Sequence, residues 1–214
     1  MTSPSKPFAK QARSKRSEER ILDASERLLS LRTWEHISVA NIAEAASMSV
    51  GGVYARFASK DALLSALHVR YTTERTEAFE AFFSQPHLKT ADLQTRIKEW
   101  VSLIVDLFHA RRGVLRTFVL QVWSDPDTLG EGAAKDLTGV YDQSIRFLLE
   151  SADKIQHPNS RNAVQLAMTA IVATLRETLI LKPAKTPGAF PISRTRLKSE
   201  LSHLALSYLQ TPST

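Results

Sequence analysis

The chain has 214 residues, of which 43% are hydrophobic and 23% are charged, with a net charge of +6. This composition is ordinary for a globular protein, and the excess of basic residues favours a polyanionic partner. The chain has no cysteine, which excludes disulfides, thiol nucleophiles and thiolate metal ligands. We find no apolar run of the roughly 18–20 residues that span a bilayer and no secretory signal, so we expect a cytoplasmic protein.

Basic residues crowd the start of the chain. We expect residues 1–14 to form a basic flexible arm, which either lies along a phosphate backbone or is a solvated tail. The first helix is predicted from Ser17 to about Leu31, with Ser17 as its cap and Ile21, Ala24 and Leu28 on its buried side. The basic residues of this region are Lys6, Lys10, Arg13, Lys15, Arg16 and Arg20.

Two short helical segments around a tight turn follow in residues 38–57. Ser38 can cap the first segment, whose apolar residues recur at the spacing of one helix face. Ser49 can cap the second, predicted from Val50 to Phe57. Gly51 and Gly52 each cost roughly 1 kcal/mol in a helix relative to alanine, which a solvent-facing helix has little reason to carry. The segment therefore indicates a helix pressed into a groove, as in a DNA-binding helix-turn-helix.

These residues resemble a known family. The stretch SVGGVYARFASKDAL at residues 49–63, and SVANIA at residues 38–43, are similar to the recognition region of the TetR (tetracycline-repressor-like) transcriptional regulators. The resemblance implies an all-α fold. It places an N-terminal three-helix helix-turn-helix domain in residues 15–62 and a C-terminal helical ligand-binding and dimerisation domain in residues 63–214, with a connecting helix over residues 59–84.

The resemblance also implies DNA-contacting roles where positions match. Tyr54, Lys60 and Ser38 are expected to hold phosphates without reading bases. Base reading is expected from Ala40, Asn41, Ser49, Val50, Gly51, Gly52 and Arg56. Asn41 and Arg56 can bond bidentately to adenine and guanine, although either can also be a solvated surface residue. The other positions offer little hydrogen bonding, so we expect readout by close approach, shape or water.

The last two predicted helices indicate how the chain assembles. Residues 163–181 are apolar almost all round, so this helix needs cover on two sides. Residues 194–209 carry an apolar stripe. We therefore expect a homodimer built on a four-helix bundle, unless a monomer core absorbs both faces. The predicted interface residues are Leu166, Ala170, Leu197, Leu201, Leu204 and Tyr208.

A small-molecule effector site is expected in the C-terminal domain. Arg176 and Glu177 interrupt an otherwise apolar helix, and buried charges need a partner or a ligand. They can equally be an ion pair at an interface, and the aromatic residues can simply be core. The predicted site residues are Trp100, Phe108, Arg116, Phe118, Trp123, Tyr141, Arg176 and Glu177, with Gln121, Arg146 and Phe147 as further candidates.

An enzyme is not expected. The six histidines form no metal-ligand motif, and no phosphate-binding glycine loop or nucleophile elbow is present. We expect no cofactor and no membrane partner. The sequence predicts a ligand-responsive repressor that leaves a pseudo-palindromic operator when a small molecule binds. Two alternatives stay open: a helical small-molecule-binding or scaffolding protein without sequence-specific DNA binding, and a nucleoid-type protein with little sequence preference.

Overall fold

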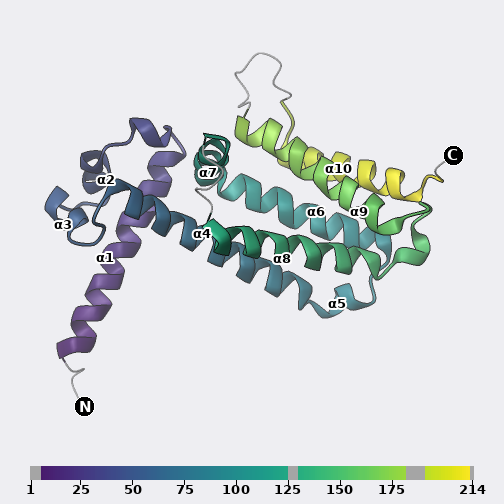
Figure 1. The fold of residues 1–214 in the computed structure, drawn as a ribbon, viewed down its shortest axis with the longest axis horizontal. Coiled ribbons are helices and arrows are strands. Elements are labelled where there is room, and N and C mark those ends of the chain that lie inside the picture. The colour runs from purple at the N-terminus through teal and green to yellow at the C-terminus, as the bar shows by residue number, and fades with distance from the viewer. Residues whose placement is uncertain (1–5, 125–129, 182–190, 213–214) are drawn as a thin grey trace. The chain divides into compact units, whose positions relative to one another are not determined.

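The computed structural model describes residues 6–124, 130–181 and 191–212, with side chains described for residues 11–121, 137–181 and 191–212 (Figure 1). No strand occurs among these residues, so the predicted all-α fold is confirmed. The N-terminal elements are α1 (Lys6–Leu29), the 3-10 turn η1 (Trp34–His36), α2 (Val39–Ala45), α3 (Val50–Tyr54) and α4 (Lys60–Phe83). The later elements are α5 (Pro86–Lys89), α6 (Leu93–Ala110), α7 (Arg112–Ser124), α8 (Gly130–Leu149), η3 (Ala152–Lys154), α9 (Ser160–Leu175), the π-helical η4 (Arg176–Leu181) and α10 (Arg194–Gln210).

The chain forms two compact units. The N-terminal unit holds residues 1–71 and residues 113–120, and the C-terminal unit holds residues 72–112 and 121–214. The expected division at residues 62 and 63 therefore differs from the observed one, because the first three turns of α4 and the start of α7 pack in the N-terminal core.

Helix α1 begins earlier than the sequence predicted. It is helical from Lys6, so most of the expected flexible arm is instead an extension of the first helix. No proline or glycine separates residues 8–29, and the chain there consists largely of good helix formers, so nothing local stops the helix from extending toward the N-terminus. The basic residues Arg13, Lys15, Arg16 and Arg20 are consequently carried on a helix.

The core of the N-terminal unit is built from α1, η1, α2, α3, the first half of α4 and the start of α7. Gly113 packs against the end of α1, where an added Cβ would lie 2.4 Å from the carbonyl oxygen of Leu29. Only glycine permits this approach. Phe118 then enters the core, with its ring centroid 4.6 Å from that of His68. The buried apolar residues of this core are Ile21, Leu22, Ala24, Leu29, Trp34, Ile37, Ile42, Ala43, Ala46, Val53, Leu63, Leu64, Leu67, Val114 and Phe118.

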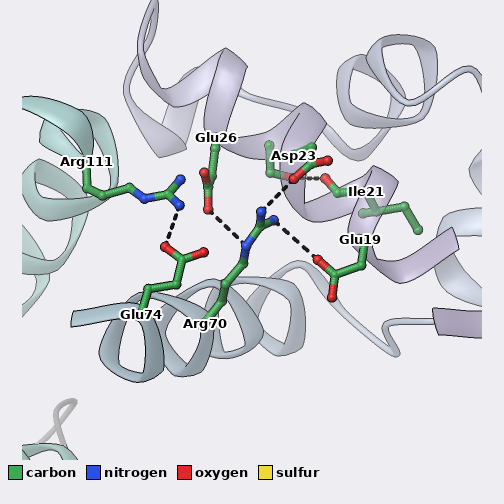
Figure 2. A network of polar contacts seen from close by, with 8 residues as sticks. Glu19, Ile21, Asp23, Glu26, Arg70, Glu74 and Arg111 are labelled. Atoms are coloured by element: carbon green, nitrogen blue, oxygen red, sulfur yellow. Dashed lines mark hydrogen bonds and ion pairs between the residues drawn. The ribbon is translucent and has the colours of Figure 1, made fainter. Parts of the chain in front are cut away.

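An ion-pair cluster holds α1 against α4 in the same unit. Figure 2 shows Arg70 of α4 reaching three carboxylates on one face of α1. Its guanidinium lies 2.7 Å from Asp23, 3.7 Å from Glu26 and 3.8 Å from Glu19. One face of α1 is therefore acidic and committed to contacts inside the protein.

The C-terminal unit is built around α6, which contacts α8, α9 and α10. Buried Arg96 donates hydrogen bonds to the backbone carbonyls of Lys89, Ala91 and Phe147 and pairs with Glu150 at 2.6 Å, so it acts as a structural brace. Asp106 of α6 accepts hydrogen bonds from two basic residues of α10, as described below. No group of His, Asp or Glu that could hold a metal occurs in the part of the chain that the structure describes.

The apolar length of α9 with η4 differs from the expectation that no segment is long and apolar enough to span a bilayer. Residues Ser160–Leu181 are long and apolar enough to cross a membrane, with mean hydropathy 1.5 over the best window, although we expected no such run. A core helix of a soluble protein passes the same test. Only 33% of that window is buried by the residues that the structure describes.

Candidate nucleic-acid interface

Helix α2 begins with a reciprocal cap between Ser38 and Asn41. The Ser38 hydroxyl oxygen accepts the Asn41 backbone N–H at 3.1 Å, and the Asn41 Oδ1 accepts the Ser38 backbone N–H at 3.0 Å. This arrangement satisfies two donors that a helix start leaves open. It also occupies the amide oxygen of Asn41, so a bidentate contact to adenine has to displace the cap, whereas its Nδ2 remains able to donate.

The turn between α2 and α3 closes in a Schellman motif. The Met48 N–H bonds to the Ala43 carbonyl and the Ser47 N–H to the Glu44 carbonyl, each at 2.9 Å. Ser47 occupies the left-handed region with φ 53°, where glycine is usual. The turn is thus sharply defined although its central residue is strained.

Two arginines of α1 hold this turn from the side. Arg20 donates hydrogen bonds to the carbonyls of Ala46 and Ser47, and Arg27 donates to the carbonyl of Ala45 at 3.0 Å. These carbonyls belong to the end of α2, where a cation also complements the helix dipole. The sequence analysis counted Arg20 only among the basic residues near the start of the chain and gave Arg27 no role, because neither contact can be predicted from local spacing.

Helix α3 presents a small, exposed face. It spans Val50–Tyr54, three residues shorter than predicted, and the Ser49 hydroxyl oxygen caps it by accepting the Gly52 N–H at 3.0 Å. Val53 is buried and anchors the helix, as its position predicted. Val50 is 42% exposed and Tyr54 is 50% exposed. Arg56 lies just beyond the helix and is also exposed, and its guanidinium donates a hydrogen bond to the neighbouring Ala55 carbonyl at 3.3 Å.

The two glycines of α3 differ in their surroundings. A Cβ added at Gly52 would lie 3.2 Å from the Ser49 Oγ that caps the helix, so internal packing favours glycine there. A Cβ added at Gly51 would meet nothing within 4 Å, and its φ lies outside the left-handed region. Neither packing nor backbone conformation inside this protein explains Gly51.

Lys60 has a contact that the sequence did not indicate. Its ammonium donates a hydrogen bond to the Trp34 carbonyl at 2.7 Å and lies 4.8 Å from the centroid of the Trp34 ring. One of its three donors therefore holds η1, and the others remain able to meet a phosphate. Ala40, the remaining predicted base-reading position, is exposed on α2.

The residues predicted for the effector site do not gather in one place. Phe118 was wrongly placed there, because it lies in the core of the N-terminal unit, to which the residues around Arg116 also belong. Trp100 is buried in the C-terminal core. Phe108 and Tyr141 are partly buried and pack against this core. Burial raises the pKa of the Tyr141 hydroxyl, and the charge of nearby Arg176 partly opposes this. The side chain of Trp123 lies outside the described residues, and Glu177 is exposed.

Trp100 carries an unsatisfied donor. Its side chain is 2% exposed, and its indole N–H has no hydrogen-bond acceptor among the described residues. A buried donor without an acceptor costs about 1–3 kcal/mol.

A separate cavity of about 410 Å³ opens on the C-terminal unit. Phe83 and Phe147 form apolar walls, and Lys89, Arg146 and Glu150 bring charge to it. Arg146 and Phe147 are the only predicted candidates that line this cavity. It differs from the predicted site, because none of the eight principal predicted residues lines it.

The predicted dimer residues differ in how far they are buried within their own chain. Leu197 and Leu201 are buried in the core of their own chain, so a partner cannot contact them directly, and Ala170 and Tyr208 are partly buried. This is a correction to the predicted interface, caused by the packing of α10 against α6 and α9. Leu166 and Leu204 are 57% and 53% exposed. Both are large apolar side chains left in solvent.

Comparisons with known proteins agree with this arrangement. Residues 21–67, which run from α1 into α4, match the family described as bacterial regulatory proteins, tetR family. No curated protein sequence matches the chain.

Three solved structures illustrate the likeness in fold. A TetR-family transcriptional regulator from Mesorhizobium loti is 15% identical with a TM-score of 0.68, covering 92% of this chain and 96% of its own. A tetR-family regulatory protein from Rhodococcus is 18% identical with a TM-score of 0.66, covering 92% and 98%. The fatty acid degradation regulator of Bacillus halodurans is 20% identical with a TM-score of 0.62, covering 89% and 94%. At these identities the likeness shows the fold alone.

Proposed function

The chain belongs to the tetR family of bacterial regulatory proteins through the domain that contains residues 21–67, and from this we propose that it is a ligand-responsive repressor of transcription. In this proposal, α3 enters the major groove of an operator. Tyr54 and Lys60 hold phosphates, and Val50 and Arg56 meet base edges. The observation that carries the proposal is Gly51, a helix position without Cβ contacts in the protein, on a face that also exposes Val50 and Tyr54.

We propose that the repressor acts as a homodimer. The support is the exposed apolar surface around Leu166 on α9 and Leu204 on α10, together with the low burial of an apolar α9. A monomer that leaves such a surface in water gains stability by covering it with a second copy. Two copies related by a two-fold axis would present two α3 helices to successive major grooves, about 34–36 Å apart, and thus read a pseudo-palindrome.

An effector in the C-terminal unit would release the DNA. Helices α4 and α7 each contribute residues to both units, so they are the continuous elements through which a change in one unit can reach the other. The unpartnered Trp100 N–H supports a ligand with an oxygen acceptor near α6. A shift from mostly bound to mostly free operator needs a preference of roughly 5 kcal/mol for the non-binding state.

The first experiment is selection of operator sequences. The purified full chain is incubated at physiological salt with sheared genomic DNA of its source organism, and the bound fragments are sequenced. A sharply enriched pseudo-palindrome supports the repressor proposal. Uniform recovery would favour a nucleoid-type protein, and no recovery would favour a helical binding protein without DNA recognition.

The effector proposal needs its own measurement. One relative of similar fold is a regulator of fatty acid degradation, so dodecanoate and other straight-chain fatty acids are the first probes. Binding is measured by the thermal shift of the protein, and operator affinity is measured with and without each probe. Probes that bind and leave operator affinity unchanged would count against a ligand-responsive mechanism, while operator recognition itself would stand.

A further inference from the structure

Helix α1 carries two faces of opposite charge in the N-terminal unit. Its acidic face, formed by Glu19, Asp23 and Glu26, is occupied by Arg70 (Figure 2). A second face holds Arg13, Arg16, Arg20 and Arg27, which we call the basic stripe. At 100° per residue these four positions lie within about 60° of one another around the helix.

The two halves of the basic stripe have different surroundings. The inner half, Arg20 and Arg27, bonds to carbonyls at the end of α2 and in the turn before α3. These contacts fix the direction of the stripe toward the helix-turn-helix. The outer half, Arg13 and Arg16, is exposed and is paired with no acidic side chain in the described part of the chain. Figure 1 shows α1 continuing toward its N-terminus well beyond α2 and α3.

The outer arginines are costly to the protein alone. Arg16 and Arg20 are four residues apart, and like charges at this spacing destabilise a helix. Arg13 stands about 10 Å from Arg20 along the axis, so the extension carries positive charge outward from the turn that positions α3. Neither Arg13 nor Arg16 pairs with a carboxylate among the described side chains, whereas a DNA backbone beside α3 would use their charge.

We propose that the outer half of the basic stripe, Arg13 and Arg16, binds phosphates of the duplex flanking the half-site that α3 reads. The inference rests on the proposed function, because it requires α3 to be in the groove. These contacts add affinity without sequence information. They lengthen the bound duplex beyond the base pairs that α3 can reach.

The test compares the double variant Arg13→Gln/Arg16→Gln with Lys15→Gln. Lys15 is exposed on the same extension, but its position lies on the acidic side of α1, so it controls for loss of charge in this region. Operator affinity is measured for each protein over a salt series, using the pseudo-palindrome from the selection experiment. Thermal unfolding checks that the variants fold like the wild type.

A dimer that loses two phosphate contacts per chain should show a salt dependence shallower by about 3–4 in log K against log salt. The ratio of wild-type to double-variant affinity should then grow about 100-fold as salt falls from 200 to 50 mM. The preference for operator over scrambled sequence should not change. Trimming the flanking base pairs should abolish the difference between the two proteins.

Three other outcomes would overturn the inference. Equal salt dependence in the wild type and the double variant would overturn the inference and leave the proposed function standing. An equal loss in Lys15→Gln would also overturn it, because the effect would then reflect total charge. Absence of operator binding by the wild type would overturn the proposed function, and this inference with it.

Discussion

Replacement of Gly51 by alanine should separate stability from DNA binding. The added methyl group meets nothing within 4 Å, and the backbone is in an ordinary region, so the folded state is not strained. Gly→Ala at such a site stabilises a protein by about 0.4–1 kcal/mol, chiefly by restricting the unfolded chain. The midpoint of thermal unfolding should therefore rise by about 1–4 °C.

The same methyl group should weaken operator binding. If α3 lies in the groove with Gly51 against the DNA, the methyl group overpacks a close interface, which costs about 1–3 kcal/mol at each site. A dimer carries two such sites, so affinity should fall by at least about 30-fold. Fluorescence anisotropy with the selected operator measures this loss, and thermal unfolding measures the gain in stability.

Gly139 of α8 supplies a matched control. A Cβ added there also meets nothing within 4 Å, but the position is in the C-terminal unit. Gly139→Ala should stabilise the protein by about 1 kcal/mol and leave operator affinity unchanged. If Gly51→Ala behaves in the same way, the reasoning that places this face of α3 against DNA is refuted.

Three further predictions concern stability. Ser47→Gly should stabilise the protein by about 0.5–1 kcal/mol in urea denaturation, because φ 53° strains a residue that has a Cβ; a loss would contradict the strain. Gly113→Ala should cost about 1–3 kcal/mol, since its Cβ would collide with the backbone of α1, and an unchanged midpoint would contradict that packing. Asp106→Asn should cost about 0.5–1 kcal/mol at pH 7, because Asp106 pairs with Arg194 and Lys198 at 2.6 Å each. Burial tends to raise the pKa of Asp106, but the hydrogen bonds from Lys198 and Arg194 outweigh it and lower the pKa below 3.8. This stabilisation is therefore present above the ordinary carboxyl pKa and is lost as pH falls through the lowered value. Wild type and variant should therefore converge in acid, and a constant difference in unfolding free energy would exclude ionic pairing.

Local signals made the helix-turn-helix predictable. Ser38 and Ser49 each precede a helix and cap it as expected, because a cap depends on residues only two or three positions away. The apolar character of α9 was equally visible, since it depends on composition alone. The low helix propensity of Gly51 and Gly52 made α3 stand out in the sequence. The structure accounts for Gly52 by its contact with Ser49, whereas an added Cβ at Gly51 would meet nothing within 4 Å.

What failed to be predicted depends on contacts between distant residues. The residues next to Phe118 in the sequence are apolar, as they would be around an aromatic residue of the ligand-binding domain. Phe118 lies in the N-terminal core because of tertiary packing, which neighbouring residues in the sequence do not reveal. The close approach of Gly113 to the backbone of Leu29 likewise joins residues that are far apart in the sequence. Leu197 and Leu201 share one stripe with core residues, and periodicity cannot distinguish a stripe facing its own core from one facing a partner.

The shortness of α3 has a consequence for hydrogen exchange. Its backbone is closed by few bonds, among them Val53 N–H to the Ser49 carbonyl at 3.2 Å and Ala55 N–H to the Gly51 carbonyl at 2.9 Å. Amides in such a segment open locally at a fraction of the global unfolding free energy. The recognition surface is thus positioned by Val53 in the core while its own amides exchange quickly. Slowing of those amides on a duplex would map the contact surface residue by residue, with no substitution in the chain.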